Sequence, residues 1–206
     1  ALRTARNRTL QGDFRATLVE RDPVLFTRLS AIVNPFRDFV DLREGAFESL
    51  LPELERACEE YNLFLYLDPF TVSSLSWESL DRIFRQIDRV KSVEILLNFN
   101  VMALGRAACV ALNKKFSQSP PDEEQLEGET SGTTQMLDAV LGGSWWQVPF
   151  KDAATFTLAC DALIFGYLSK MRARFAEVCH HEIKERHAHA IPKYVLVFGS
   201  RHSDAL

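Results

Sequence analysis

The chain has 206 residues, 47% of them hydrophobic and 25% charged, so it can bury one substantial core and still carry an insertion or a small cap. Its formal net charge of −4 argues against attraction of the whole surface to nucleic acid, although a local basic stripe would still bind it. No apolar run approaches the roughly 20 residues that cross a bilayer. Residues 1–28 are rich in arginine and lack the apolar segment of a signal peptide, so we expect a cytoplasmic protein.

The cysteines are dispersed and show no Cys-x-x-Cys spacing; they are Cys58, Cys109, Cys160 and Cys179. This pattern is typical of small core residues in a reducing compartment, and not of a disulfide framework or a zinc site. Four histidines gather between positions 180 and 189, but they lack His-Glu-x-x-His spacing. We therefore expect a solvated helix end there and no metal site.

Strand-like and helix-like segments alternate over residues 1–101, which is typical of a sheet built from βαβ units. The sequence predicts strands in apolar segments at 14–19, 36–42, 63–67, 93–99 and 194–198. It predicts helices at 1–10, 23–33 and 47–61, and a fourth that begins behind Ser74 or Ser76. The expected fold class is therefore α/β.

The character of the chain changes between residues 102 and 191. A helix is expected at 103–116, followed by an acidic loop or linker at 117–134 that is rich in Ser, Pro and Gly. A short helix at 136–141, a turn with Trp145 and Trp146, and one long helix at 152–187 complete the region. We interpret 102–191 as a helical insertion, or cap, in an α/β domain made of residues 1–101 and 192–206.

The most informative segment is 63–70, which reads Leu-Phe-Leu-Tyr-Leu-Asp-Pro-Phe. A continuous apolar run of this length is typical of a central strand buried on both faces. Because Pro69 cannot extend the ladder, Asp68 is expected at the carboxyl end of that strand, where ligands bind in open α/β sheets. An Asp that only caps a turn is the alternative.

Two more acidic residues end predicted strands. Glu20 follows the strand at 14–19, where nucleotide-binding sheets place the carboxylate that accepts both ribose hydroxyls. The alternative is a charge that favours the dipole of the next helix. Glu44 and Gly45 follow the next strand, either in a loop that closes over a base or in a plain turn. Since Glu20, Glu44 and Asp68 would repel one another on one sheet edge, a shared ligand site accounts for them better than stability does.

The segments 63–70 with Trp77, 93–99, 143–146 and 194–202 together resemble the three-Cys-motif partner proteins. These are class I methyltransferase-like (Rossmann-like) proteins found beside radical-enzyme-like partners in mobile and phage-related gene neighbourhoods. The resemblance covers nearly the whole chain and implies S-adenosylmethionine as cofactor. It implies that Glu20 binds the ribose and that Glu44 or Gly45 lies near the adenine. Asp68, Pro69 and Phe70 would then face the methyl group and the substrate.

The chain departs from that family at two points. Thr71 stands where the family usually has glycine after Asp-Pro-Phe. The glycine-rich first strand and loop that hold the methionine end of the cofactor are not seen, since Gly12 stands alone before Glu20. Either that loop lies upstream of a fragment, or the protein has lost the loop and its activity.

The sequence leaves several functions open. The first is a methyltransferase that acts on nucleic acid, with Asp68 as the central residue. Asp-Pro-Phe partly matches the Asp-Pro-Pro-Tyr signature of amino-methyltransferases, in which case Phe70 would stack on a base and Asp68 would accept from an amine. The second is a catalytically silent partner subunit that binds another protein. The third is a nicotinamide-type dinucleotide binder, for which Glu20 would serve equally well.

Overall fold

The computed structural model describes residues 15–69, 75–85, 92–117, 130–184 and 191–202. They form a mixed α/β structure with parallel strands, as the alternating pattern predicted. The chain divides between Leu50 and Leu51 into two compact units. The helix expected at 1–10 and the predicted site residue Phe70 lie outside the described residues.

The first unit contains two parallel strands and one long helix. Strand β1 (Ala16–Glu20) pairs with β2 (Val40–Glu44), and α2 (Pro23–Val33) connects them. The α2 helix begins where the sequence predicted, because Asp22 accepts from the backbone N–H groups of Val24 and Leu25. The predicted start of the second strand at residue 36 is wrong. A 3-10 turn (Asn34–Phe36) occupies that segment, and a second one (Phe47–Leu50) follows β2.

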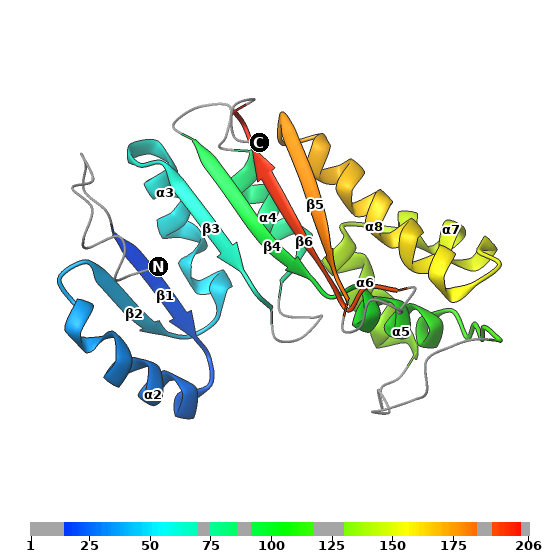
Figure 1. Ribbon diagram of the computed structural model, residues 1–206, viewed down its shortest axis with the longest axis horizontal. Coiled ribbons are helices and arrows are strands. Elements are labelled where there is room, and N and C mark those ends of the chain that lie inside the picture. The colour runs from blue at the N-terminus through cyan, green and yellow to red at the C-terminus, as the bar shows by residue number, and fades with distance from the viewer. Residues whose placement is uncertain (1–14, 70–74, 86–91, 118–129, 185–190, 203–206) are drawn as a thin grey trace. The chain divides into compact units, whose positions relative to one another are not determined.

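The second unit is built on a four-stranded sheet in the order β3-β4-β6-β5 (Figure 1). Strand β3 (Leu63–Leu67) runs parallel to β4 (Val93–Phe99), and both have the predicted bounds. Strand β6 (Tyr194–Ser200) lies antiparallel between β4 and β5 (Glu177–Ile183). As a result, β3, β4 and β5 run in one direction and β6 runs against them.

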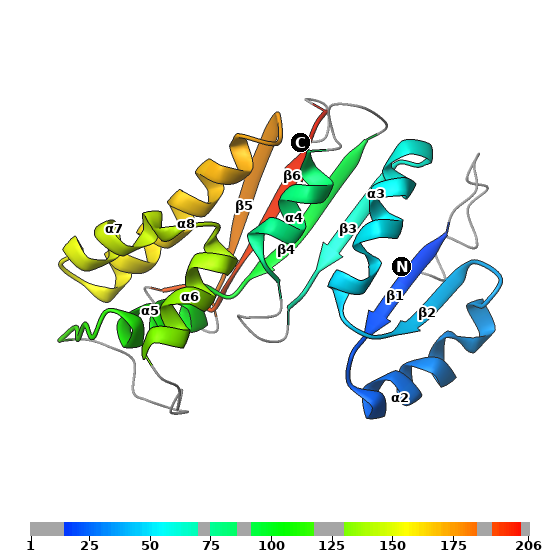
Figure 2. The ribbon, with the colours of Figure 1, turned by 180° about the vertical axis from the view of Figure 1, so that it is seen from behind.

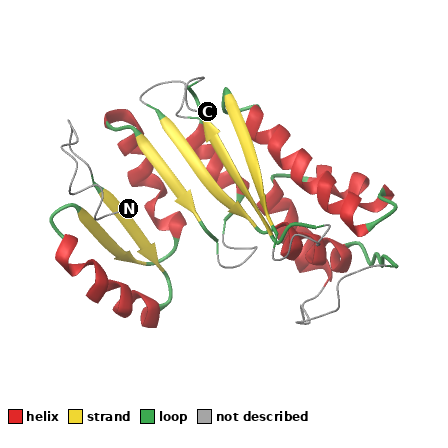
Figure 3. Ribbon diagram, viewed as in Figure 1, coloured by secondary structure: helices red, strands yellow, loops and turns green. Residues whose placement is uncertain are grey.

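Helices cover one face of this sheet, as Figures 2 and 3 show. They are α3 (Leu51–Glu60), α4 (Trp77–Phe84) and α8 (Phe156–Arg172). Of the shorter helices, α5 (Val101–Ala111) and α7 (Gln147–Asp152) pack against α8, and α6 (Thr130–Leu141) packs against α5 and α4. Ser76 caps α4, which was one of the two predicted caps. Apolar residues of β4, β6 and α8 form the centre of the core, including Ile95, Val197, Leu163 and Leu168.

The prediction that 63–67 is a central strand buried on both faces is wrong within the described part of the chain. Leu65 and Leu67 are buried, but Phe64 is 59% exposed and Tyr66 is 57% exposed. Alternate residues of a strand point to opposite faces. The helices cover the Leu65 face, and no described helix covers the other face, which is turned towards the viewer in Figure 1. Among the described strands β3 also stands at the edge of the sheet.

The long helix predicted over 152–187 is also wrong. Helix α8 ends at Arg172, and Glu177–Ile183 forms strand β5. Seven residue pairs join β5 to β6, from Glu177 with Ser200 to Ile183 with Tyr194. His180 and His181 therefore lie in a strand and not at a helix end. The insertion at 102–191 is thus not purely helical, because it supplies one strand of the sheet.

Two further helix boundaries differ from the prediction. The segment 117–134 is not a loop throughout, since α6 begins at Thr130. The helix expected at 103–116 ends earlier, at Ala111, because Asn113 adopts a positive φ of 48° that stops the helix. Of the two tryptophans in the turn, Trp146 is fully buried and its indole N–H donates to Asp138 at 2.7 Å. This contact supports structural packing for Trp146 and not stacking on a substrate.

Lys114 ties the end of α5 to the end of α7. Its Nζ donates to the backbone carbonyls of Phe150, Lys151 and Ala153, and lies 4.5 Å from the centre of the Phe116 ring. A cation at a helix C-terminus satisfies carbonyls that have no partner within the helix. Lys114 therefore fixes the position of α7.

We expect Lys114→Met to lower the free energy of unfolding by about 1–2 kcal/mol, because the variant keeps the apolar stem but leaves three carbonyls without their cation. Urea unfolding followed by circular dichroism measures this change. The neighbouring exposed Lys115 is the matched control, and Lys115→Met should change the free energy by less than about 0.5 kcal/mol. Equal effects of the two substitutions would contradict the role given to Lys114.

Candidate functional site

Asp68 lies at the carboxyl end of β3, as predicted, and is exposed. The parallel register pairs Leu67 with Leu97, so the next residues on the two strands, Asp68 and Asn98, come side by side. The side-chain N–H of Asn98 donates to Asp68 Oδ1 at 2.8 Å. This bond fixes the direction of a carboxylate that would otherwise turn freely in solvent.

Tyr66 is the second polar neighbour of Asp68. The two residues are separated by one position on β3 and so lie on the same face of the sheet. Partial burial raises the pKa of the Tyr66 hydroxyl, and the charge of Asp68 and a hydrogen bond to it raise this pKa further. The hydroxyl therefore stays protonated beside the Asp68 carboxylate.

A small apolar pocket with a volume of about 30 Å³, partly open to solvent, lies at the carboxyl ends of β3 and β4. Pro69, which the sequence placed in the site, lines it. The other lining residues lie on β4, in the loop before α4, at the start of α5, on α6 and on α8. They are Leu75, Leu97, Asn98, Phe99, Asn100, Leu104, Val140 and Tyr167. Burial raises the pKa of Tyr167 above its usual value, so this side chain is neutral.

Asn98 carries a further feature of the site. Its Oδ1 atom is buried and has no hydrogen-bond partner within the described residues. Most buried polar atoms in proteins have a partner, and an acceptor left without one costs about 1–3 kcal/mol. The side-chain nitrogen of Asn98 therefore holds the Asp68 carboxylate, while its unpaired oxygen lowers the stability of the fold.

Glu20 and Glu44 end neighbouring strands of the first unit and are direct partners in the β1–β2 register. Glu20 Oε1 accepts from the backbone N–H of Asp22 at 2.8 Å, so part of this carboxylate closes the turn into α2. The backbone N–H of Gly45 donates to the Glu20 carbonyl at 3.0 Å. Gly45 has a φ of +145°, which glycine adopts without strain, so its contacts are those of a turn residue.

The structure thus pairs Glu20 with Glu44 in the first unit and Asp68 with Asn98 in the second. Sequence reasoning noticed Asn98 only as the end of a strand, and it missed Tyr66 as a partner of Asp68. One signal could have found both, because residues that follow parallel strands meet at the same sheet edge and residues i and i+2 of a strand share a face.

Two general findings concern other kinds of site. Within the described residues, no group of three or more His, Cys, Asp or Glu side chains is placed to hold a metal ion. Across the same part of the chain, no helix combines the length and apolar character needed to cross a membrane.

Comparison of the chain with protein-family models, with curated proteins and with solved structures finds no match.

Proposed function

We propose that this protein has a class I methyltransferase-like sheet, belongs with the three-Cys-motif partner proteins that its sequence resembles, and binds S-adenosylmethionine. The observation that carries the proposal is the order β3-β4-β6-β5, with β6 antiparallel between strands that run the other way. The class I methyltransferase sheet ends in the same manner, with its last strand inserted antiparallel between the two that precede it. Asp68 then stands at a strand end where such sheets bind ligands.

The acidic residues of the first unit fit the nucleoside part of this cofactor. Glu20 and Glu44 lie side by side after parallel strands, and carboxylates are suited to accept from the two hydroxyls of a ribose. Glu20 Oε1 already accepts from Asp22, which holds the side chain in place and leaves the other oxygen for a hydroxyl. In the proposal Glu20 binds the ribose and Glu44 or Gly45 lies near the adenine.

Bound S-adenosylmethionine would supply the methyl group, and the chain's own residues would orient the acceptor. Asp68 accepts a hydrogen bond from the acceptor group, and its fixed direction aligns that group for in-line attack. Pro69 and the apolar pocket offer an apolar surface next to it. If the acceptor is an amine, Asp68 also stabilises the proton that the nitrogen must lose. Phe70 remains the proposed stacking residue, and nucleic acid the proposed substrate.

Calorimetric titration with S-adenosylmethionine and S-adenosylhomocysteine tests cofactor binding. We expect Glu20→Ala to weaken binding by roughly tenfold or more, because a hydrogen bond to a charged group contributes about 1.5–3 kcal/mol. Glu20→Gln should weaken it less, since the amide oxygen can still accept from Asp22. The exposed Glu48 on the turn after β2 is the control, and Glu48→Ala should bind as the wild type does.

Two results would change the proposal. If the wild type binds neither molecule, the methyltransferase function is wrong. If it binds both but Glu20→Ala binds equally well, only the ribose assignment is wrong, and Glu20 is then a residue of the turn into α2.

A partner subunit without catalytic activity is the second candidate, and exposed apolar side chains of the second unit favour it. Val148 on α7 and Leu158 and Phe165 on α8 are all more than half exposed. Leu158 and Phe165 are two turns apart and so lie near one face of α8. In this candidate function these side chains would bind a radical-enzyme-like protein, and the titration above would show no cofactor binding.

A further inference from the structure

Two of the four cysteines lie on helices that pack against each other. Cys109 is on α5 and Cys160 is on α8, and both thiols are free. Cys109 is partly exposed, whereas Cys160 is fully buried. A partly exposed thiol can meet a small oxidant, but a buried thiol can react only with a group that the fold places beside it.

Gly105 allows α5 to approach α8 closely at Cys160. A Cβ built on Gly105 would stand 2.9 Å from Cys160 Sγ, which is closer than a real Cβ atom comes to its neighbours. Any residue larger than glycine at position 105 would therefore collide with the thiol. The Cys160 sulfur occupies the space that a side chain at position 105 would fill.

Cys109 lies next to the same space. It follows Gly105 by four residues on α5, and side chains at i and i+4 of a helix are neighbours, about 5–6 Å apart at Cβ. The Cα–Cβ bond of a helical residue tilts towards the N-terminus of its helix, so Cys109 leans towards Gly105. Helix α8 runs antiparallel to α5, since Phe156 contacts Phe116 beyond the end of α5 as well as the Gly105 position. Cys160 therefore leans towards the turn that carries Cys109.

The two thiols differ in reactivity as well as in exposure. Burial, and after it the negative charge of the nearby Cys109, raise the pKa of Cys160 to about 12. Because the thiolate is the nucleophile, the protonated Cys160 does not react with an oxidant on its own. Oxidation therefore begins at Cys109, and Cys160 is the second thiol to react.

We propose that Cys109 and Cys160 form a reversible disulfide between α5 and α8 when a hydroperoxide oxidises Cys109. With hydrogen peroxide, the Cys109 sulfur attacks one oxygen; an S–O bond forms, the O–O bond breaks, and one water leaves with the thiol proton. The Cys160 sulfur then attacks the sulfenic acid; the S–S bond forms, the S–O bond breaks, and hydroxide leaves as water with the Cys160 proton. The two thiols lose two electrons in total, and the peroxide becomes two waters.

The bond would fasten together two helices that line the apolar pocket, since Leu104 is on α5 and Tyr167 is on α8. In a reducing compartment thiol reductants reopen such a bond, so it would form only during oxidative conditions. The modification is therefore a reversible cross-link at the pocket and not a permanent part of the fold.

Treatment of the full chain with hydrogen peroxide, followed by digestion with trypsin, tests this assignment. Mass spectrometry should find the peptide 107–114 joined to the peptide 152–170, with a mass two hydrogen atoms below the sum of the two. Dithiothreitol should separate them again, because a disulfide is reducible and a sulfinic acid is not. In Cys109→Ser the joined peptides should be absent. In Cys160→Ala, Cys109 should stop at the sulfenic acid, which dimedone labels.

Cys179 is the matched control. It is partly exposed, as Cys109 is, but it lies opposite Phe198 on the face of the sheet that the described helices leave uncovered. The sheet therefore separates it from Cys160. Cys179→Ser should form the bond between Cys109 and Cys160 as fully as the wild type does.

A wild type in which Cys109 stays a free thiol, or stops at the sulfenic acid, overturns the inference. A bond from Cys109 to a second copy of the chain, or to Cys179, in place of Cys160 also overturns it. Because the wild-type peptides are measured directly, a variant that fails to fold does not decide the result. Neither S-adenosylmethionine nor nucleic acid enters the experiment, so its outcome is independent of the proposed function.

Discussion

Gly166→Ala is expected to lower the free energy of unfolding by about 1–3 kcal/mol, although glycine to alanine within a helix normally raises it. Gly166 lies within α8, and a Cβ built there would overlap Cζ3 of Trp145. The indole cannot move away freely, because its N–H donates to the Leu141 carbonyl at 2.9 Å. The added methyl group must therefore displace Trp145 from the helix.

Gly132 in α6 provides the control for this substitution. A Cβ at Gly132 would have no atom within 4 Å, so Gly132→Ala should raise the free energy of unfolding by up to about 1 kcal/mol. Urea unfolding of both variants, followed by tryptophan fluorescence, gives the two signs. A stabilising effect at both positions would mean that Trp145 does not pack against α8 as the structure has it.

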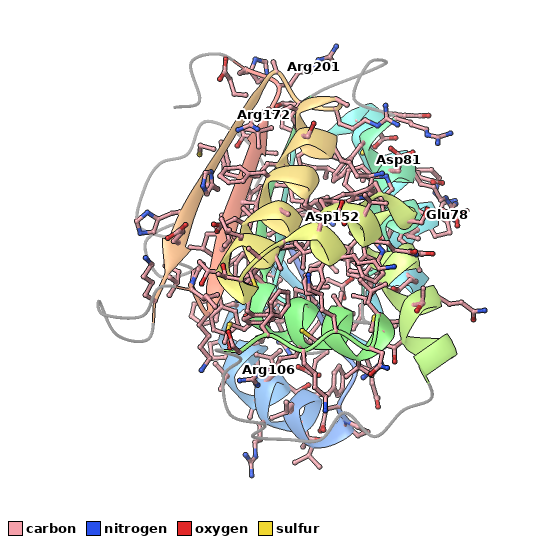
Figure 4. The ribbon with its side chains drawn as sticks, turned by 90° about the vertical axis from the view of Figure 1, so that its right-hand side faces the viewer. Glu78, Asp81, Arg106, Asp152, Arg172 and Arg201 are labelled. Atoms are coloured by element: carbon pink, nitrogen blue, oxygen red, sulfur yellow. The ribbon has the colours of Figure 1, made fainter. Side chains whose placement is uncertain are left out.

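Asp81→Asn is the second substitution with a large expected effect. The Asp81 side chain on α4 is 7% exposed and accepts from Arg174 at 2.6 Å and from Arg85 at 2.7 Å; its place on the helix is labelled in Figure 4. The substitution leaves two guanidinium groups without their carboxylate. Arg85 is 71% exposed and Arg174 is 36% exposed, so water can hydrate both guanidinium groups in the variant. We therefore expect the free energy of unfolding to fall by only about 1–2 kcal/mol.

The same carboxylate makes stability depend on pH. Burial raises the pKa of Asp81, but the hydrogen bonds and charges of Arg174 and Arg85 outweigh burial and hold this pKa below its usual 3.8. A depressed pKa means that the folded state holds the proton less tightly than the unfolded state. The contribution of Asp81 is therefore complete above pH 3.8 and is lost as the pH falls through the lower folded value.

Denaturant unfolding of the wild type and of Asp81→Asn over the acid range checks this expectation. The difference in the free energy of unfolding should shrink as the pH falls below about 4. The partly exposed ion pair of Glu55 with Arg82 is the control, and Glu55→Gln should cost less than about 1 kcal/mol. A difference between wild type and Asp81→Asn that stays constant into strong acid would contradict the role of the ion pair.

The strands that the sequence predicted correctly are those whose side chains alone favour the strand. The runs of apolar and aromatic residues that form β3 and β4 have the predicted bounds, since each run by itself favours a strand even where one face of it stays exposed. Strand β5 was missed because it contains His180, His181 and Glu182, which are exposed and polar. Its conformation depends on hydrogen bonds to β6, and no local pattern in the sequence reports that pairing.

The candidate site was predicted in part for a similar reason. Proline after an apolar strand is a local signal, and it correctly placed Asp68 at a strand end. The hydrogen bond from Asn98 joins residues 30 positions apart, and it exists because β3 and β4 pair in one particular register. The pattern of side chains within either strand does not predict how the two strands are aligned with each other.

The sequence by itself determined the α/β class, the positions of most strands, the start of α2 at Asp22 and the strand end at Asp68. These features follow from burial, from the missing N–H of proline and from helix capping, all of which act within a few residues. Only the tertiary structure decided the antiparallel place of β6, the strand nature of β5 and the partners of Asp68. Each of these depends on hydrogen bonds and packing between distant segments, whose free energy appears only when the chain brings them together.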